Sequence, residues 1–165
     1  MTRVSLQDVT CSIARTVEVM NDAWAWLIVR DVFLGVRRFD DLCADLGISR
    51  KVLAARLKQL TTAGVLTHDD GTGAPTERAG YRLTDKGADL VPILAAIVEW
   101  GDRWEPTAGG PPILLRHSEC GAVGVDIACT DCGESVAAAT LHAEPGPGGS
   151  AGRGTALIGR RLAAG

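Results

Sequence analysis

Two helical segments joined by a short glycine-containing turn constrain this sequence more than any other feature. Residues 39–46 are expected to form a short helix, with acidic residues at its positive N-terminal end and Gly47 after its last turn. Ser49 is placed to cap a longer helix over residues 50–63, which Gly64 ends. A short helix, a tight turn and a second helix together form a helix-turn-helix.

Helical patterns also precede and follow this pair. Residues 13–20 are expected to form a short helix with Ser12 as its N-cap, and residues 23–34 a second helix. The last predicted helix is long and covers residues 85–104. Pro92 lies inside it, and because proline removes a backbone hydrogen bond, we expect a kink there.

A β-hairpin is predicted before the last helix. Residues 65–68 and 78–83 have the pattern of short strands, and the run DDGTGAP at residues 69–75 between them has turn chemistry. Helices, a hairpin and a closing helix in this order indicate a winged helix-turn-helix, so the predicted fold class is α+β and mainly helical.

The composition changes near Pro106, which suggests three parts. Residues 1–105 carry periodic apolar residues and are predicted to be the winged-helix domain; residues 106–143 form a Cys/His segment, and residues 144–165 a flexible tail rich in Gly, Ala and Pro. No apolar run approaches the roughly 18–20 residues of a membrane span, and no signal-peptide pattern is visible. We therefore expect a soluble, cytoplasmic protein with no membrane partner.

Charge is distributed unevenly along the chain. The formal net charge is −3, which excludes a globally basic nucleic-acid binder. Residues 46–67, however, contain four basic side chains and no acidic one. A basic patch on a mildly acidic protein is compatible with binding of double-stranded DNA at one face.

The predicted helix over residues 50–63 has an apolar face and a small, basic face. Leu53, Leu57 and Leu60 form the core stripe when successive residues are placed 100° apart. Alanine permits close approach to the major groove, and Lys or Arg reaches phosphates or guanine edges. The candidate DNA-contacting residues of this helix and its cap are Ser49, Arg50, Lys51, Ala54, Ala55 and Lys58. The alternative is an ordinary solvated helix face.

Three stretches carry a family resemblance: CSIARTVEVMNDAWAWLIVRDVFLGVRRFDDL at residues 11–42, LGISRKVLAARLKQLTTAGVL at residues 46–66, and ERAGYRLTDKGADLVPILAAIVEWGDRW at residues 77–104. They resemble the HxlR-type winged-helix transcriptional regulators, distant relatives of the MarR-type regulators. The resemblance implies a homodimer that binds a palindromic DNA operator, and we expect it to act as a repressor.

The resemblance also implies a dimer surface made by the N-terminal helices and a long last helix. Apolar residues of the last helix fit that role, although each fits an intramolecular core equally well: Leu90, Ile93, Leu94, Ile97 and Trp100.

Basic residues outside the longer helix complete the predicted DNA surface. Arg78 on the hairpin would enter the minor groove, and Arg37 or Arg38 would contact phosphate. The hairpin also carries acidic residues, which argue against a strongly attractive wing: Asp69, Asp70 and Glu77. They leave open a second hypothesis, a protein-interaction adaptor that keeps the winged helix without strong DNA binding. No GxSxG, P-loop, dinucleotide or HExxH pattern occurs, so an enzyme is not expected.

Cys11 is a redox-sensing candidate. Some HxlR-type regulators sense quinones, aldehydes or oxidants through a cysteine at this landmark, where the usual Cys-Pro is replaced here by Cys11–Ser12. A helix N-terminus and the nearby Arg15 favour a reactive thiolate. The alternative is a small packing residue at a dimer interface, and Cys43 is interpreted as an apolar filler. A small-molecule effector is compatible with the resemblance.

The segment after Pro106 contains a paired metal-ligand pattern. His117 and Cys120, followed by Gly, precede Cys129 and Cys132, which are again followed by Gly. One His and three Cys at this spacing are typical of a closed, structural zinc site. We therefore predict a small zinc-ribbon-like segment after the winged helix; the alternative is a set of free reduced thiols. Residues 122–128, between the two halves, are expected to form a short hairpin.

Overall fold

The computed structural model describes residues 6, 8–69, 79–144, 146–147 and 153–163. The chain divides into two compact units. One unit comprises residues 23–126, and the other comprises residues 1–22 together with residues 127–165.

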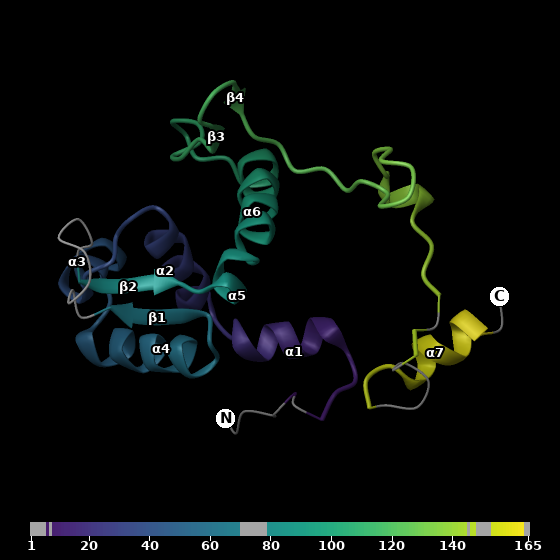
Figure 1. Cartoon of the computed structure of the whole chain (residues 1–165), viewed down its shortest axis with the longest axis horizontal. Helices are drawn as coiled ribbons and strands as arrows, with labels where there is room; N and C mark the ends of the chain where they lie inside the picture. Colours follow the sequence, from purple (N-terminus) through teal and green to yellow (C-terminus); the bar gives the residue numbers. More distant parts are fainter. Residues whose placement is uncertain (1–5, 7, 70–78, 145, 148–152, 164–165) are drawn as a thin grey trace. The chain divides into compact units, whose positions relative to one another are not determined.

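The larger unit is built around a buried helix, α2 (Ala23–Phe33). α2 contacts three further helices, α3 (Phe39–Leu46), α4 (Arg50–Thr62) and α6 (Val91–Trp104), as well as a two-stranded sheet (Figure 1). The core side chains are apolar and come from all of these elements: Ala25, Ile28, Val29, Val32, Leu42, Leu53, Leu57, Leu60, Val65, Leu66, Leu94 and Ala95. This arrangement confirms the predicted helix-turn-helix and its core face.

The turn between α3 and α4 is set by local sequence signals. Gly47 ends α3 in the left-handed region at φ 63°, which a residue with a side chain rarely adopts. The Ser49 hydroxyl then accepts a hydrogen bond from the Val52 amide at 3.3 Å and caps α4 as predicted. Both bounds of α3 match the sequence prediction.

The sheet consists of β1 (Leu66–Asp69) and β2 (Gly80–Leu83), paired antiparallel with Leu66 opposite Leu83 and Asp69 opposite Gly80. β1 contacts α4 and β2 contacts α2. The predicted hairpin is confirmed by this pairing, while its tip and Arg78 lie outside the described residues.

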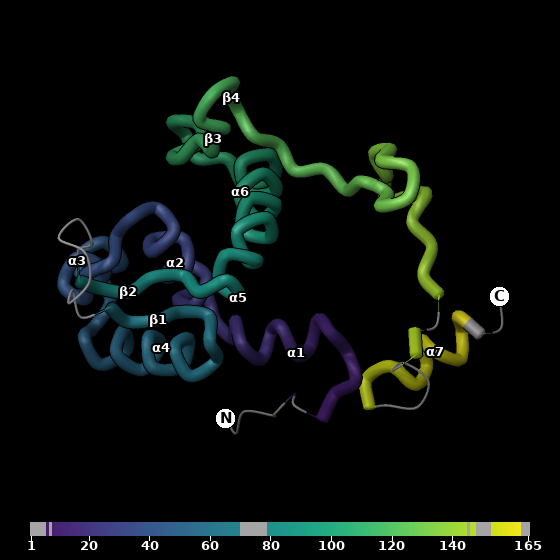
Figure 2. The backbone as a smooth tube through the Cα atoms, in the orientation of Figure 1, coloured from purple at the N-terminus to yellow at the C-terminus, as the bar shows by residue number. Residues whose placement is uncertain are grey.

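The single kinked helix predicted over residues 85–104 is wrong. Thr84 caps a one-turn helix, α5 (Asp85–Ala88), and α6 begins at Val91. Figure 2 shows the trace passing from the sheet through α5 into α6. Pro92 is in the first turn of α6, where its missing N–H would have no intrahelical partner, so it begins a helix instead of bending one.

A close approach of backbone to backbone fixes the position of α5. A Cβ atom added at Gly87 would lie 2.2 Å from the carbonyl oxygen of Val65. The same Val65 oxygen accepts a hydrogen bond from the Thr84 amide at 3.1 Å. Only glycine fits between α5 and the residue that precedes β1, and the sequence pattern alone gives no sign of the contact.

A second, smaller sheet follows α6 in the larger unit. β3 (Arg116–His117) pairs antiparallel with β4 (Gly121–Ala122), so the hairpin turns inside the first half of the metal-ligand pattern. The prediction of a hairpin over residues 122–128 is therefore wrong. Residues 123–127 form neither helix nor strand, and the Val125 amide donates to the Glu99 carboxylate on α6 at 2.8 Å.

The other unit contains α1 (Ser12–Val19), a 3₁₀ turn (Ala138–Thr140) and α7 (Ala156–Ala163). Cys11, with extended φ −127° and ψ 124°, occupies the N-cap of α1, so the prediction of Ser12 as the cap is wrong. Ser12 is instead the first residue of α1, and its hydroxyl accepts a hydrogen bond from the Arg15 guanidinium at 3.2 Å. α7 lies in the tail that composition marked as flexible.

Candidate nucleic-acid interface

The outward face of α4 is the strongest candidate surface for DNA. Three buried leucines hold the opposite face in the core, and full burial of each contributes about 1.5–3 kcal/mol. Every predicted contact residue at the cap and on the outer face is exposed: Ser49, Arg50, Lys51, Ala54, Ala55 and Lys58. α4 therefore presents small and basic side chains to solvent on a rigidly anchored helix.

Arg50 has a partner within the protein that sequence reasoning missed. Its guanidinium forms an ion pair with Asp40, at the first turn of α3, and its Cζ lies 4.7 Å from the centre of the Phe39 ring. The hydrogen bond to Asp40 raises the pKa of Arg50 above its ordinary value. Both side chains of the pair are largely exposed, so the guanidinium can exchange the carboxylate for a phosphate oxygen at little cost.

Arg37 and Arg38 precede α3 and differ in their surroundings. Arg38 is the exposed N-cap residue of α3. Arg37 is half-buried, and its carbonyl accepts a hydrogen bond from the Tyr81 amide at 2.9 Å. A Cβ atom at Gly80 would lie 2.5 Å from the same carbonyl oxygen, so β2 needs glycine there. Of the two arginines, Arg38 is the more exposed to solvent.

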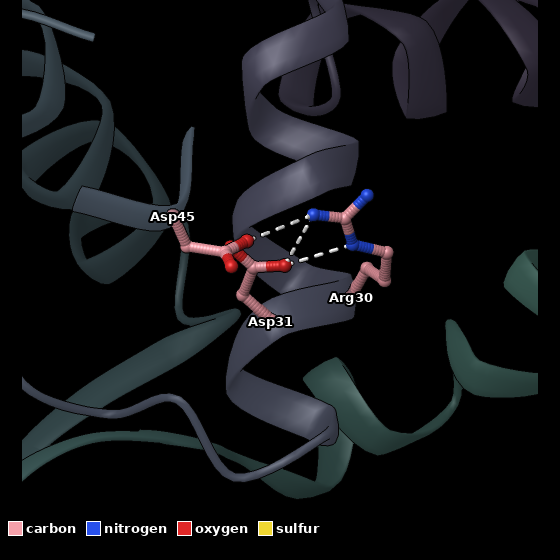
Figure 3. Close-up of polar contacts among 3 residues, drawn as sticks. All are labelled: Arg30, Asp31 and Asp45. Atoms are coloured by element: carbon pink, nitrogen blue, oxygen red, sulfur yellow. Dashed lines mark hydrogen bonds and ion pairs between the residues drawn. The ribbon is translucent and has the colours of Figure 1, made fainter. Parts of the chain in front are cut away.

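A cluster of charged side chains around the buried Asp31 ties α2 to α3 (Figure 3). Arg30 donates from Nε to Asp31 at 2.8 Å, and its Nη2 lies 2.6 Å from the same Asp31 oxygen and 3.4 Å from Asp45 on α3. Asp31 is only 2% exposed, and its second carboxylate oxygen has no hydrogen-bond partner among the described residues. Burial raises the pKa of Asp31, although the adjacent Arg30 opposes this. The sequence signal was a single acidic residue inside the apolar run AWAWLIVRDVF.

The raised pKa of Asp31 predicts a pH-dependent contribution to stability. The folded protein binds this proton more readily than the unfolded chain, in which the pKa of Asp is 3.8. Protonated Asp31 therefore makes its full contribution to the free energy of unfolding below pH 3.8, and this contribution is lost as pH rises through the folded pKa. We expect the free energy of unfolding of Asp31→Asn, relative to the natural chain, to fall as pH is lowered from neutral toward the unfolded-chain value of 3.8. Urea denaturation of both chains at each pH measures the difference.

Replacing the exposed Asp41 on α3 by Asn is the matched control for that comparison. If the free energies of unfolding of Asp31→Asn and the natural chain change in parallel across this pH range, the pKa of Asp31 is not raised by folding.

The outer face of α6 is apolar and exposed. Ile93, Ile97, Trp100 and Trp104 recur at helical spacing and are 44–60% exposed, whereas Leu94 and Ala95 point into the core. The five residues suggested for a dimer surface thus differ in burial. Leu94 belongs to the core and Leu90 is half-buried, whereas Ile93, Ile97 and Trp100 are exposed to solvent.

α6 and the segment after it also border a cavity of about 430 Å³. Its walls are mainly apolar. Phe33 comes from α2, Pro92 and Ala95 come from α6, and the segment after α6 supplies Leu115, Val123 and Val125 as well as the charged Arg116 and Asp126. The size is within the range of small-molecule sites. Binding of a small-molecule effector stays a prediction.

The cysteine and histidine candidates lie in both units. His117 and Cys120 belong to the larger unit, where His117 Nδ1 lies 3.2 Å from Cys120 Sγ. Cys129 and Cys132 belong to the other unit. Backbone hydrogen bonds from Cys132 and Asp131 lower the pKa of Cys129. Within the described residues, no group of three or more His, Cys, Asp or Glu side chains is arranged to hold a metal ion.

The remaining cysteines are free thiols, and both Cys11 and Cys43 are half-buried. Arg15, which was expected to favour the Cys11 thiolate, directs its guanidinium to the Ser12 hydroxyl. Redox sensing by Cys11 stays a prediction.

Comparisons with known proteins relate this chain to DNA-binding regulators. A family model described as HxlR-like helix-turn-helix matches residues 19–108. The HTH-type transcriptional regulator Rv3095 of Mycobacterium tuberculosis, itself uncharacterised, is 41% identical over 138 residues, which are 83% of this chain and 87% of that protein. No helix in the described part of the chain is long and apolar enough to span a membrane.

Two solved structures of candidate transcription factors are also similar to this chain. The crystal structure of PA1607, a candidate transcription factor, matches with a TM-score of 0.74 and 33% identity, covering 86% of this chain and 99% of that one. PA1374, a candidate transcription factor from Pseudomonas aeruginosa, matches with a TM-score of 0.57 and 31% identity over 92% of this chain and all of that one.

Proposed function

The chain belongs to the HxlR-like helix-turn-helix family of transcriptional regulators, and on that premise we propose that it is a homodimeric repressor that binds a palindromic DNA operator through α4. The observation that carries this proposal is the exposed face of α4, on which Lys51, Lys58 and two alanines stand opposite three buried leucines. Small residues let the helix enter the major groove, and the lysines reach phosphates or base edges.

The homodimer in this proposal rests on α6. Four large apolar side chains along one face of a single helix form a contiguous exposed stripe, which a monomeric soluble protein rarely keeps. A second copy of the same helix is the partner that an isologous contact would supply. Two-fold symmetry would place two copies of α4 on half-sites separated by about one turn of DNA.

The competing hypothesis of an adaptor without strong DNA binding relied on the acidic hairpin. Asp69, one of its acidic residues, forms an ion pair with Arg82 on the neighbouring strand at 3.1 Å. The charge of Asp69 is therefore partly balanced by Arg82. Asp69 then repels DNA phosphates less, so the hairpin gives weaker support to the adaptor hypothesis. Homologous regulators likewise favour regulation of transcription over an enzymatic role.

Selection of genomic DNA fragments by the purified full-length protein tests the proposed function. We expect enrichment of palindromic sequences whose half-sites are about 10 base pairs apart. The affinity for an enriched fragment should fall as salt rises, because phosphate contacts release counterions. A folded protein that enriches no sequence, or whose weak DNA binding ignores both sequence and salt, would support the adaptor instead.

A further inference from the structure

The hollow beside α6 has the dimensions of a small-molecule site. It measures about 430 Å³ and is bordered by α6, by the end of α2 and by residues 115–126; we name it the α6 cavity. A second hollow of about 370 Å³ adjoins it, since Ala95, Leu115 and Val123 line both. All of these residues belong to one compact unit, residues 23–126. Sites for small molecules typically measure about 300–1,000 Å³.

Hydrogen bonds hold the segment after α6 against the helix. The Val125 amide donates to the Glu99 carboxylate on α6 at 2.8 Å. The Val123 amide donates to the Leu115 carbonyl at 3.0 Å and closes a loop within the segment. α6 in turn contacts α2. The walls of the α6 cavity are therefore built by defined contacts of the folded chain.

Apolar side chains in the walls remain in contact with water. Phe33, Val123 and Val125 line the α6 cavity and are 38–48% exposed. Ala95, on the α6 wall, is small and leaves room beside the helix. An apolar molecule in the cavity would remove these side chains from water, and this removal favours binding.

The charges at the α6 cavity restrict the class of ligand. Among the described residues that line it, Arg116 and Asp126 carry charge, and both are exposed. Their charges sum to zero, so they favour neither an anion nor a cation. An ion among the apolar walls would lose its hydration without a buried partner, which is costly, whereas an uncharged molecule avoids this cost.

The α6 cavity and the exposed apolar stripe of α6 lie on opposite faces of the helix. Ala95 at the cavity and Ile97 on the stripe are two residues apart, which is about 200° around the helix axis. Val91 at the cavity and Trp100 on the stripe differ by about 180°. A second copy packed on the stripe would leave the cavity open, so a second copy is not its occupant.

We propose that the α6 cavity binds an uncharged, largely apolar small molecule, and that this molecule is the effector of the regulator. Only the effector role rests on the proposed function. The bound molecule would contact both α6 and the end of α2, and α2 also contacts α4. A ligand shifts the arrangement of these helices if it binds one arrangement more tightly than another. Because α6 also carries the stripe, such a shift would reposition the two copies of α4 in a dimer.

Fluorescence titration of the full-length protein with phenylnaphthylamine, an uncharged apolar dye whose emission rises in apolar surroundings, tests the site. We expect saturable binding. Val123→Asp should weaken it by at least about tenfold, because a carboxylate would enter the apolar wall. Ile97→Asp places the same charge on the opposite face of α6 and should leave dye binding unchanged. Absence of saturable binding, or binding that is lost in Ile97→Asp but not in Val123→Asp, would overturn the site.

Two further measurements cover folding and ligand class. If circular dichroism shows that Val123→Asp is unfolded, Val123→Thr, which replaces a methyl by a hydroxyl, should still weaken dye binding by about threefold. Anilinonaphthalenesulfonate is the sulfonated analogue of the dye and should bind more weakly than the uncharged dye. Tighter binding of the sulfonate that is lost in Arg116→Gln would overturn the uncharged class in favour of an anion.

The effector role has a readout of its own. Saturating dye should change the affinity for an enriched DNA fragment by at least about fivefold in the natural chain and leave it unchanged in Val123→Asp. Unchanged affinity in a protein that binds both dye and DNA would overturn the effector role. A protein that binds the dye in this cavity but enriches no DNA would overturn the proposed function and the effector role with it, while the binding site stands.

Discussion

Simultaneous replacement of Lys51 and Lys58 by alanine is expected to weaken operator binding by at least about tenfold, since each lost base or phosphate contact costs about 1–3 kcal/mol. Both side chains are exposed on the outer face of α4. Their removal leaves the apolar anchor of the helix intact, so folding should not change. The logarithmic salt dependence of binding should also become shallower, by about one for each phosphate contact removed. Fluorescence anisotropy with an operator fragment measures both quantities.

A double variant on α7 is the matched control for charge. Arg160→Ala with Arg161→Ala removes the same two positive charges from an exposed helix outside the helix-turn-helix. A general electrostatic effect would weaken DNA binding equally in the two double variants. A folded Lys51/Lys58 variant with the natural affinity would refute the assignment of α4 as the recognition helix.

Local sequence signals were sufficient for the helix-turn-helix itself. Gly47 and Ser49 mark the turn through a left-handed conformation and a capping hydroxyl, both of which depend on neighbouring residues only. The leucine spacing of α4 then predicted its buried face, because a helix anchored on a core needs an apolar stripe. The outward position of Lys51 and Lys58 follows from the same geometry.

The errors arose where tertiary contacts decide the outcome. The predicted long last helix is two helices, and the first of them packs Gly87 against the Val65 carbonyl, a contact across the hairpin that no periodicity encodes. The Arg50–Asp40 ion pair joins two helices across the turn, so a wheel drawn for α4 alone could not show it. Asp31 was missed because a sequence pattern does not show which polar side chain of a largely apolar helix is buried.

The exposed stripe on α6 leads to the prediction with the largest expected effect. Ile97→Asp should convert the dimer to a monomer and reduce operator affinity by about 100-fold or more. Each monomer would then bind its half-site alone and would lose the affinity that two linked DNA-binding domains gain over one. Ile97 is 47% exposed in the single chain. A carboxylate there stays hydrated in the monomer, but it would be buried without a partner in a dimer seam. Light scattering after size-exclusion chromatography measures the mass.

A second aspartate variant is the control that separates a disrupted dimer seam from a general effect of added charge. Leu157→Asp introduces the same charge at an apolar position on α7 that is 71% exposed, and the natural mass should be retained. Because Ile97 contributes little to the core of the single chain, the circular dichroism of Ile97→Asp should match that of the natural protein. If Ile97→Asp remains a stable dimer, the α6 stripe is not the seam. If the natural chain is itself a monomer at the concentrations at which it binds DNA, the two-fold arrangement of α4 on a palindrome fails with it.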